Sequence, residues 1–282
     1  LVEAFYETPF FWFLEDKEYK VEARNNRGIF TESFSEERLK LVFGEKRVFS
    51  NIDIYKGKKR VGEIDVLVIF ANRAIVLQAK SKKLTIEARK GNDNCLRSDF
   101  KKAVQDSYDQ AFSCAEFLND GKYTLLDTDG NELNIKRDYQ EIYPFCIVSD
   151  HYPALTFQAR QFLTYNETEI IKPPFVMDVF LLDVLTEMLQ SPLYFLSYVN
   201  RRVGYSEQIL SSHELTILSY HLKQNLWVDE EVSMMQLGDD IGADLDLAML
   251  TRRDNAPGTE TPEGILTKYK TTSYGKKVQE IE

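Results

Sequence analysis

The stretch GEIDVLVIFANRAIVLQAKSKK, residues 62–83, decides how the rest of the chain is arranged. It contains two apolar segments, residues 64–70 and 74–77, separated by a short turn, which is the pattern of a β-hairpin. Three polar residues accompany these segments: Asp65, Gln78 and Lys80. A charged side chain loses its hydration when it is buried, so a buried strand gains no stability from it. The polar residues therefore indicate a functional role.

The register of this hairpin decides whether the polar residues meet. A two-residue turn at Asn72 and Arg73 would place Asp65 opposite Lys80. Opposed residues point to one face of a sheet, and side chains alternate along each strand. We therefore expect Asp65, Gln78 and Lys80 to share a face. A three-residue turn without a bulge would shift the register by one residue and separate them.

The length and composition of the chain limit the classes of protein to which it can belong. A chain of 282 residues with 43% hydrophobic residues can build a substantial core. It has neither a run of about eighteen apolar residues nor a secretory signal, so we expect a soluble, cytoplasmic protein without a membrane partner. Widely spaced cysteines and histidines support neither disulfides, nor a zinc site, nor a histidine-based triad. They are Cys95, Cys114, Cys146, His151, His213 and His221.

Charge is distributed unevenly. The whole chain has a formal net charge of −10, yet residues 56–102 contain 13 basic and 5 acidic residues. A basic zone around the hairpin, inside an acidic chain, is typical of a local site for a polyanion. We expect nucleic acid, most simply DNA, to contact this zone through Lys58, Lys59, Arg60, Lys82 and Lys83. The alternative is a lysine-rich loop that only faces solvent.

Patterns along the chain predict an α/β core followed by helices. We expect a helix at 33–43 with Ser35 as its N-cap and Gly44 at its end, strands at 48–55 and 142–148, a helix at 98–118 and a hairpin at 123–135. Four segments result: an aromatic arm at 1–30, the α/β domain at 31–150, a mainly helical subdomain at 151–226, and an acidic, breaker-rich tail at 227–282. The aromatic arm or the helical region is a candidate surface for a protein partner or a second copy.

The polar residues of the hairpin suit phosphodiester hydrolysis. Mg²⁺ prefers oxygen ligands, which Asp65, the Gln78 side chain and the Ala79 carbonyl can supply. An acid of the preceding helix, Glu36, would complete the set, with Glu37 or Glu32 as substitutes. The metal, Mg²⁺ or Mn²⁺, would activate water, and Lys80 would orient that water and offset charge on the phosphate. Phosphate-binding and esterase motifs based on glycine are absent from the sequence.

These residues resemble the PD-(D/E)xK nuclease superfamily and, within it, the nuclease-related domain NERD. The resemblance covers residues 32–118 and rests on Glu36, Asp65, the Gln78-x-Lys80 pair and Gln110. It implies a restriction-endonuclease-like core, a mixed sheet flanked by helices, with Gln110 near the nucleic acid. Gln78 replaces the usual acid, as in Mrr-like restriction endonucleases, and leaves less negative charge to hold a metal.

Three functions remain open from the sequence. The first is a metal-dependent DNA endonuclease or nickase that could serve a defence or repair system, which the Asp65, Gln78 and Lys80 face in its basic zone motivates. The second is an inactive nuclease fold that binds nucleic acid or a protein partner. The third is a structural α/β domain whose hairpin charges are solvated at a sheet edge.

Overall fold

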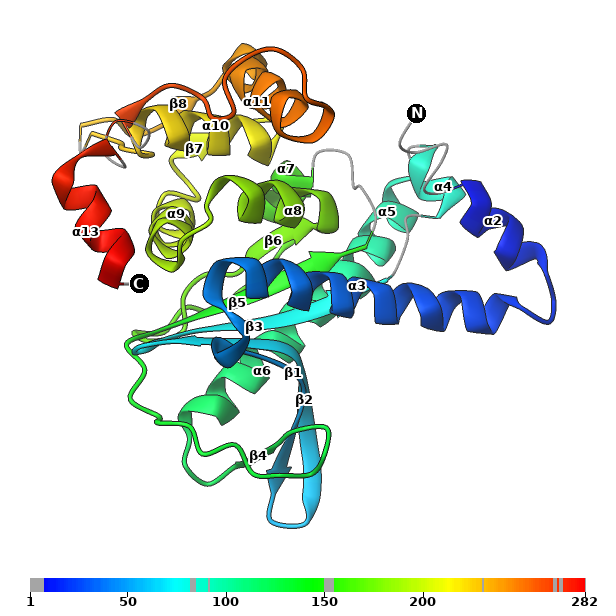
Figure 1. Ribbon diagram of the computed structural model, residues 1–282. Helices are drawn as coiled ribbons and strands as arrows, with labels where there is room; N and C mark the ends of the chain where they lie inside the picture. The colour runs from blue at the N-terminus through cyan, green and yellow to red at the C-terminus, as the bar shows by residue number, and fades with distance from the viewer. Residues whose placement is uncertain are drawn as a thin grey trace. The chain divides into compact units, whose positions relative to one another are not determined.

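The computed structural model describes residues 8–81, 85–90, 92–149, 155–229, 231–265, 268 and 271–281 (Figure 1). The chain forms two compact units, each considered by itself. The first contains Leu1–Pro153 and Phe162–Phe180, and the second contains Ala154–Gln161 and Leu181–Glu282. None of the described helices has the length and apolar character that crossing a membrane requires.

A six-stranded mixed sheet forms the centre of the first unit, with the strand order β4-β1-β2-β3-β5-β6. Its strands are β1 (Val48–Lys56), β2 (Lys59–Phe70), β3 (Arg73–Lys80), β4 (Thr124–Leu126), β5 (Glu141–Val148) and β6 (Phe175–Asp178). The pairs β1–β2, β2–β3 and β1–β4 are antiparallel, whereas β3–β5 and β5–β6 are parallel. The sheet and its flanking helices confirm the predicted fold class.

Helix α3 (Lys20–Phe43) is much longer than the helix predicted at 33–43. Ser35 lies inside it and donates its hydroxyl hydrogen to the Thr31 carbonyl, so the prediction that Ser35 is an N-cap was wrong. Gly44 does end the helix, with φ of 79° and its N–H bonded to the carbonyl of Lys40. The C-terminal half of α3 buries Leu39, among other apolar residues, and therefore packs on the sheet.

The predicted helix at 98–118 is present, with an interruption. It consists of α5 (Asp93–Phe100), a π-helical segment η2 (Lys101–Gln105) and α6 (Asp106–Asn119). Helix α6 packs on the sheet through Ala111, Cys114 and Leu118, which join one apolar cluster with residues of β1, β2 and β3. The predicted hairpin at 123–135 is reduced to β4 and an isolated bridge between Leu126 and Glu132.

The remaining short elements of the first unit are α2 (Thr8–Glu15), η1 (Glu45–Arg47) and α4 (Ile86–Arg89). Part of the predicted aromatic arm forms α2, in which Phe10 lies against the guanidinium of Arg27, 4.4 Å from the ring centroid. Phe5 and Tyr6 of that arm lie outside the described residues.

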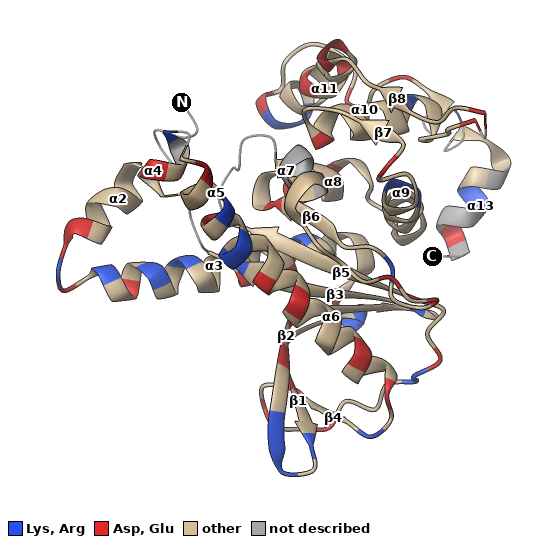
Figure 2. Cartoon of the chain, turned by 180° about the vertical axis from the view of Figure 1, so that it is seen from behind, with Lys and Arg blue, Asp and Glu red and all other residues tan. Residues whose placement is uncertain are grey.

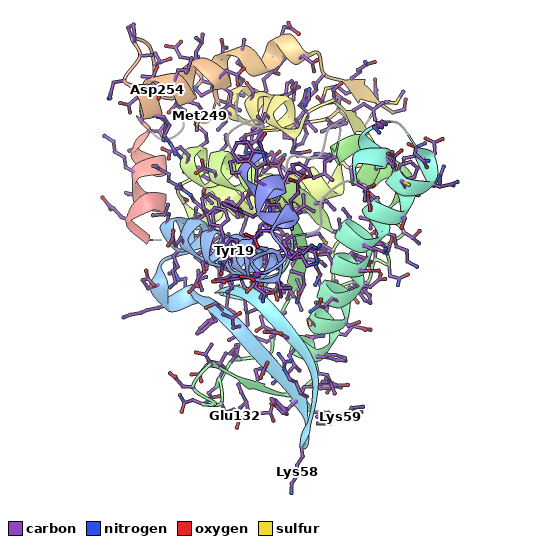
Figure 3. The ribbon with its side chains drawn as sticks, turned by 90° about the vertical axis from the view of Figure 1, so that its right-hand side faces the viewer. Tyr19, Lys58, Lys59, Glu132, Met249 and Asp254 are labelled. Atoms are coloured by element: carbon purple, nitrogen blue, oxygen red, sulfur yellow. The ribbon has the colours of Figure 1, made fainter. Side chains whose placement is uncertain are left out.

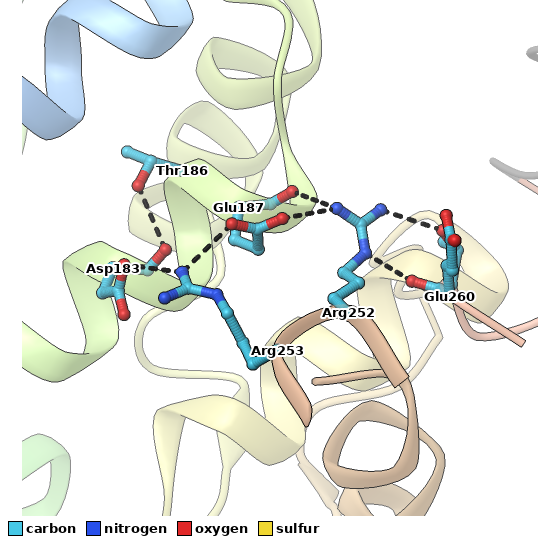
Figure 4. A network of polar contacts seen from close by, with 7 residues as sticks. Asp183, Thr186, Glu187, Arg252, Arg253 and Glu260 are labelled. Atoms are coloured by element: carbon cyan, nitrogen blue, oxygen red, sulfur yellow. Dashed lines mark hydrogen bonds and ion pairs between the residues drawn. The ribbon is translucent and has the colours of Figure 1, made fainter. Parts of the chain in front are cut away.

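The second unit is mainly helical. It contains all but the last residue of α7 (Leu155–Phe162) and all but the first two residues of α8 (Val179–Met188). Its other elements are α9 (Pro192–Gly204), β7 (Ile209–Leu210), α10 (Glu214–Gln224), β8 (Met235–Gln236), η3 (Asp239–Gly242), α11 (Ala243–Asp254) and α13 (Ser273–Ile281). Arg252 and Arg253 of α11 form ion pairs with Glu187, and Arg253 also pairs with Asp183 (Figure 4). These pairs tie α11, which lies in the predicted tail, to α8.

Candidate active site

The hairpin of β2 and β3 turns one residue earlier than the sequence suggested. Phe70 pairs with Arg73, so the turn consists of Ala71 and Asn72, with φ of 53° at Ala71. The register therefore differs by two residues from the expected one, and the expected pairing of Asp65 with Lys80 was wrong. The ladder of paired residues ends at Val66 and Leu77, so that Asp65 is level with Gln78.

Beyond Val66 and Leu77 the two strands continue, but side chains replace the main-chain ladder. The carboxylate of Asp65 accepts a hydrogen bond from the Ala79 N–H at 2.7 Å. The Gln78 amide donates from Nε2 to the Glu63 carbonyl at 2.6 Å. We call this place, where Asp65 and Gln78 bridge β2 and β3, the strand gap. Both side chains are buried there, with exposed fractions of 8% and 0%.

A change of face in β1 and β2 produces the strand gap. Ile64 and Leu67 belong to the same apolar cluster under α6, although residues three apart point to opposite faces of a regular strand. The paired residues of β1 and β2 skip Asn51, opposite Asp65, and Asn51 has φ of 52°. The ribbon therefore twists at this position, which directs the Asp65 carboxylate toward β3.

Helix α6 completes one side of the strand gap. Lys80 donates from Nζ to Oε1 of Gln110 at 2.8 Å, and Ser107 donates its hydroxyl hydrogen to the Gln78 carbonyl at 3.1 Å. The Cys114 thiol approaches the Glu63 carbonyl at 3.3 Å. Sequence reasoning singled out Lys80 and Gln110 but missed Ser107 and Cys114. Their spacing of three, four and seven residues along one helix face was the available signal.

Helix α3 contributes an acid, although it is not the one preferred from the sequence. Glu36 forms an ion pair with Lys40 at 2.9 Å, within its own helix. Glu32 lies one turn earlier and is half-buried; burial raises its pKa, Glu63 raises it further, and Lys80 lowers it. Glu32 also raises the pKa of Asp65. The structure thus brings the substitute Glu32, rather than Glu36, into electrostatic contact with Asp65 and Lys80.

The carboxyl group of Asp65 has an unusual affinity for protons. Burial raises its pKa from 3.8 to about 7, and the charges of Glu32 and Glu63 act in the same direction. The hydrogen bond from Ala79 and the charge of Lys80 oppose this shift. A buried carboxyl group with a perturbed pKa, beside a lysine, is typical of a functional site.

Residues 27–146 match the family model described as Nuclease-related domain, NERD. Residues 27–146 are thus similar to a nuclease-related domain, and we call this segment the NERD domain. The match begins in α3, ends in β5 and contains Glu32, Asp65, Gln78, Lys80 and Gln110. No curated protein and no solved structure gives a significant match to the chain. The NERD domain therefore contains every residue of the strand gap.

The oxygen atoms around Gln78 meet some of the requirements of a site for a hard cation such as Mg²⁺. Among the described residues, no three His, Cys, Asp or Glu side chains form a group that could hold a metal ion. However, Oε1 of Gln78 is buried without a hydrogen-bond partner. Leaving such an oxygen unsatisfied costs about 1–3 kcal/mol, and amide and carboxylate oxygens are ligands that Mg²⁺ accepts. Gln78, Asp65 and Glu32 are the residues that would hold it.

The predicted nucleic-acid contacts differ in their surroundings. Lys58 and Lys59 lie exposed at the tip of the β1–β2 hairpin (Figure 3). Arg60 instead forms ion pairs with Asp53 and Glu63, so its charge is already neutralised. Lys82 and Lys83 lie outside the described residues. The structure therefore leaves two of the three described basic residues of this set available to a polyanion.

Proposed function

We propose that the NERD domain is a metal-dependent nuclease that hydrolyses phosphodiester bonds, with DNA as its substrate. The observation that carries this proposal is the convergence of Asp65, Gln78 and Lys80 on the strand gap, where backbone pairing stops. A buried carboxylate, an unsatisfied amide oxygen and a lysine together offer oxygen ligands and a positive charge.

Each residue of the strand gap has a proposed role. Asp65, Gln78 and Glu32 hold Mg²⁺ or Mn²⁺, and when bound the ion polarises a phosphoryl oxygen and lowers the pKa of a water molecule. Lys80 orients the attacking water and stabilises the negative charge that grows on the phosphate. Gln110 holds the Lys80 ammonium through their 2.8 Å hydrogen bond. Cleavage yields a free hydroxyl end and a phosphate end.

Nicking of supercoiled plasmid DNA tests this function. We expect conversion to open circles with Mg²⁺ or Mn²⁺, no conversion in EDTA, and a loss of rate on the order of 100-fold or more in Lys80→Ala, because one aimed charge is removed. Lys122→Ala is the matched control, since Lys122 is an exposed lysine whose ion pair is with Asp120. Equal nicking by Lys80→Ala and the parent protein, or none under any metal and salt condition, would overturn the proposal.

One observation favours a second function. The described residues lack a group of three metal-binding acids, histidines or cysteines, and Asp65 is already bonded to Ala79. This suits a nuclease fold that binds nucleic acid or a protein without cleaving it. In that case Asp65→Ala would keep salt-sensitive DNA binding and no metal would promote cleavage by the parent, whereas the catalytic proposal predicts that Asp65→Ala binds but no longer cleaves.

A further inference from the structure

The β1–β2 hairpin extends beyond the rest of the sheet. Its ladder continues to the pair Lys56 and Lys59, whereas pairing of β2 with β3 ends at Val66. Among the described strands, β4 also lies along it and pairs with β1 at Asp53, Ile54 and Tyr55, before the tip. Figure 1 shows the hairpin running away from the body of the first unit. It is therefore a two-stranded ribbon with a free end.

The free end of the ribbon is basic and polar. Within the described part of the chain, neither Lys58 nor Lys59 takes part in an ion pair, and both are exposed. Arg60 braces the two strands through Asp53 at 2.6 Å and Glu63 at 2.7 Å. Figure 2 shows the positive charge gathered at the hairpin end. The tip thus presents two uncompensated ammonium groups on a braced support.

The distance from the tip to the strand gap is set by the length of β2. Seven residues separate Lys58 from Asp65, and a strand rises about 3.3 Å per residue, so this arm is about 23 Å long. Successive base pairs of a duplex are about 3.4 Å apart along each strand. The arm therefore spans about seven base pairs.

The chemistry of the tip favours a duplex over a single strand. Proteins that hold single strands combine basic residues with aromatic side chains on which bases stack. The segment 56–61 has the sequence KGKKRV, with no aromatic residue. A two-stranded ribbon can lie along a groove of B-DNA, where lysine ammonium groups can contact the phosphates on either side.

We propose that Lys58 and Lys59 hold the phosphates of duplex DNA about seven base pairs to one side of the phosphate at the strand gap. This inference rests on the proposed function, because it uses the strand gap as the place of cleavage. The preferred substrate is then a duplex that continues on that side of the cut. Cuts should therefore avoid about seven phosphates next to one end of the cut strand, either its 5′ end or its 3′ end.

Binding of a 20-base-pair duplex in EDTA tests the contact without cleavage. Each lost phosphate contact lowers the slope of log affinity against log salt by about 0.9, so Lys58→Glu/Lys59→Glu should lower it by about 2 and reduce affinity at 0.1 M salt on the order of 50-fold. Lys276→Glu/Lys277→Glu is the control, since these are also two exposed lysines, placed on α13 of the second unit. A tip variant with the parent slope would overturn the inference.

Mapping cuts on end-labelled linear duplexes tests the distance. We expect the parent protein to leave about seven phosphates uncut beside one end, and the tip variant to cut more slowly and without that protected zone. If the parent cuts DNA with no such zone, the hairpin inference is wrong and the nuclease proposal stands. If the parent neither binds nor cuts DNA, both are wrong.

Discussion

The Asp65 carboxylate accepts a hydrogen bond from the Ala79 N–H at 2.7 Å, across the point where the ladder of β2 and β3 has ended. This bond connects Asp65, whose ionisation is costly, to β3, the strand that carries Gln78 and Lys80. Because the carboxylate accepts it in place of a backbone carbonyl, the strands separate without leaving the Ala79 N–H unpaired. The stability of the strand gap therefore depends on the protonation state of Asp65.

The first prediction concerns pH. The folded pKa of Asp65, about 7, is raised above the usual 3.8, so the folded protein binds this proton more tightly than the unfolded chain does. The contribution of Asp65 to the free energy of unfolding is therefore fully present below about pH 4 and is lost as the pH rises to about 7. Asp65→Asn keeps an oxygen acceptor for Ala79 and should raise stability at pH 8 in EDTA by about 2–4 kcal/mol.

Urea unfolding at pH 5 and pH 8 measures this effect. Asp65→Asn should have a flatter dependence on pH than the parent protein, whereas the exposed control Asp246→Asn should not. A parent protein and an Asp65→Asn variant with the same pH dependence would contradict the assignment of this shift to Asp65.

The second prediction separates two acids one helical turn apart. Glu32 acts on the Asp65 and Lys80 charges, whereas Glu36 is paired with Lys40. Glu32→Gln should weaken Mn²⁺ binding about tenfold or more and lower the pKa of Asp65, and Glu36→Gln should change neither. Mn²⁺ electron paramagnetic resonance measures the affinity, and a larger effect from Glu36→Gln would show that Glu36, rather than Glu32, binds the metal.

The third prediction concerns Gln78. Its Nε2 donates to the Glu63 carbonyl at 2.6 Å, while Oε1 is buried without a partner. Gln78→Glu would place an oxygen opposite that carbonyl and should lower stability without metal by about 1–3 kcal/mol. Because a carboxylate binds a cation more strongly, Mn²⁺ should restore more of the melting temperature in this variant than in the parent protein.

Thermal denaturation with and without Mn²⁺ tests the Gln78 prediction, with Gln140→Glu as a control on an exposed amide that lies just before β5. If Mn²⁺ leaves Gln78→Glu as unstable as it is in EDTA, Gln78 does not face a cation.

The fourth prediction concerns the second unit. Arg202 pairs with Glu214 through bonds of 2.6 Å and 3.1 Å, and Tyr198 donates to the same carboxylate at 2.7 Å. Both charged side chains are buried, with exposed fractions of 9% and 6%. Arg202→Met leaves the buried carboxylate of Glu214 without its cationic partner and should lower the free energy of unfolding by about 3–5 kcal/mol. The exposed pair of Lys122 with Asp120 provides the comparison, and Lys122→Met should cost less than about 1 kcal/mol.

Equilibrium unfolding by circular dichroism checks this difference. Equal losses from the buried and the exposed pair would mean that Glu214 finds another partner when Arg202 is removed.

Local sequence patterns were sufficient for the α/β core. Alternating and continuous apolar residues specified β1, β2, β3 and β5, because each strand must bury the same side chains in any packing. The Gly44 stop of α3 and the periodicity of α6 followed from similarly local rules. Asp65, Gln78 and Lys80 stood out because polar residues interrupt apolar strands.

The sequence by itself thus determined the strands of the α/β core and singled out Asp65, Gln78 and Lys80 as its candidate functional residues. Only the tertiary structure decided that the turn is Ala71-Asn72, that β1 and β2 change face at Asn51 and Asp65, and that Glu32 acts on Asp65. The apolar pattern of the two strands is compatible with either position of the turn. The helical pattern of α3 is likewise compatible with either Glu32 or Glu36 facing the sheet. The choice depends on how α3, α6 and the sheet pack together, which is a nonlocal property.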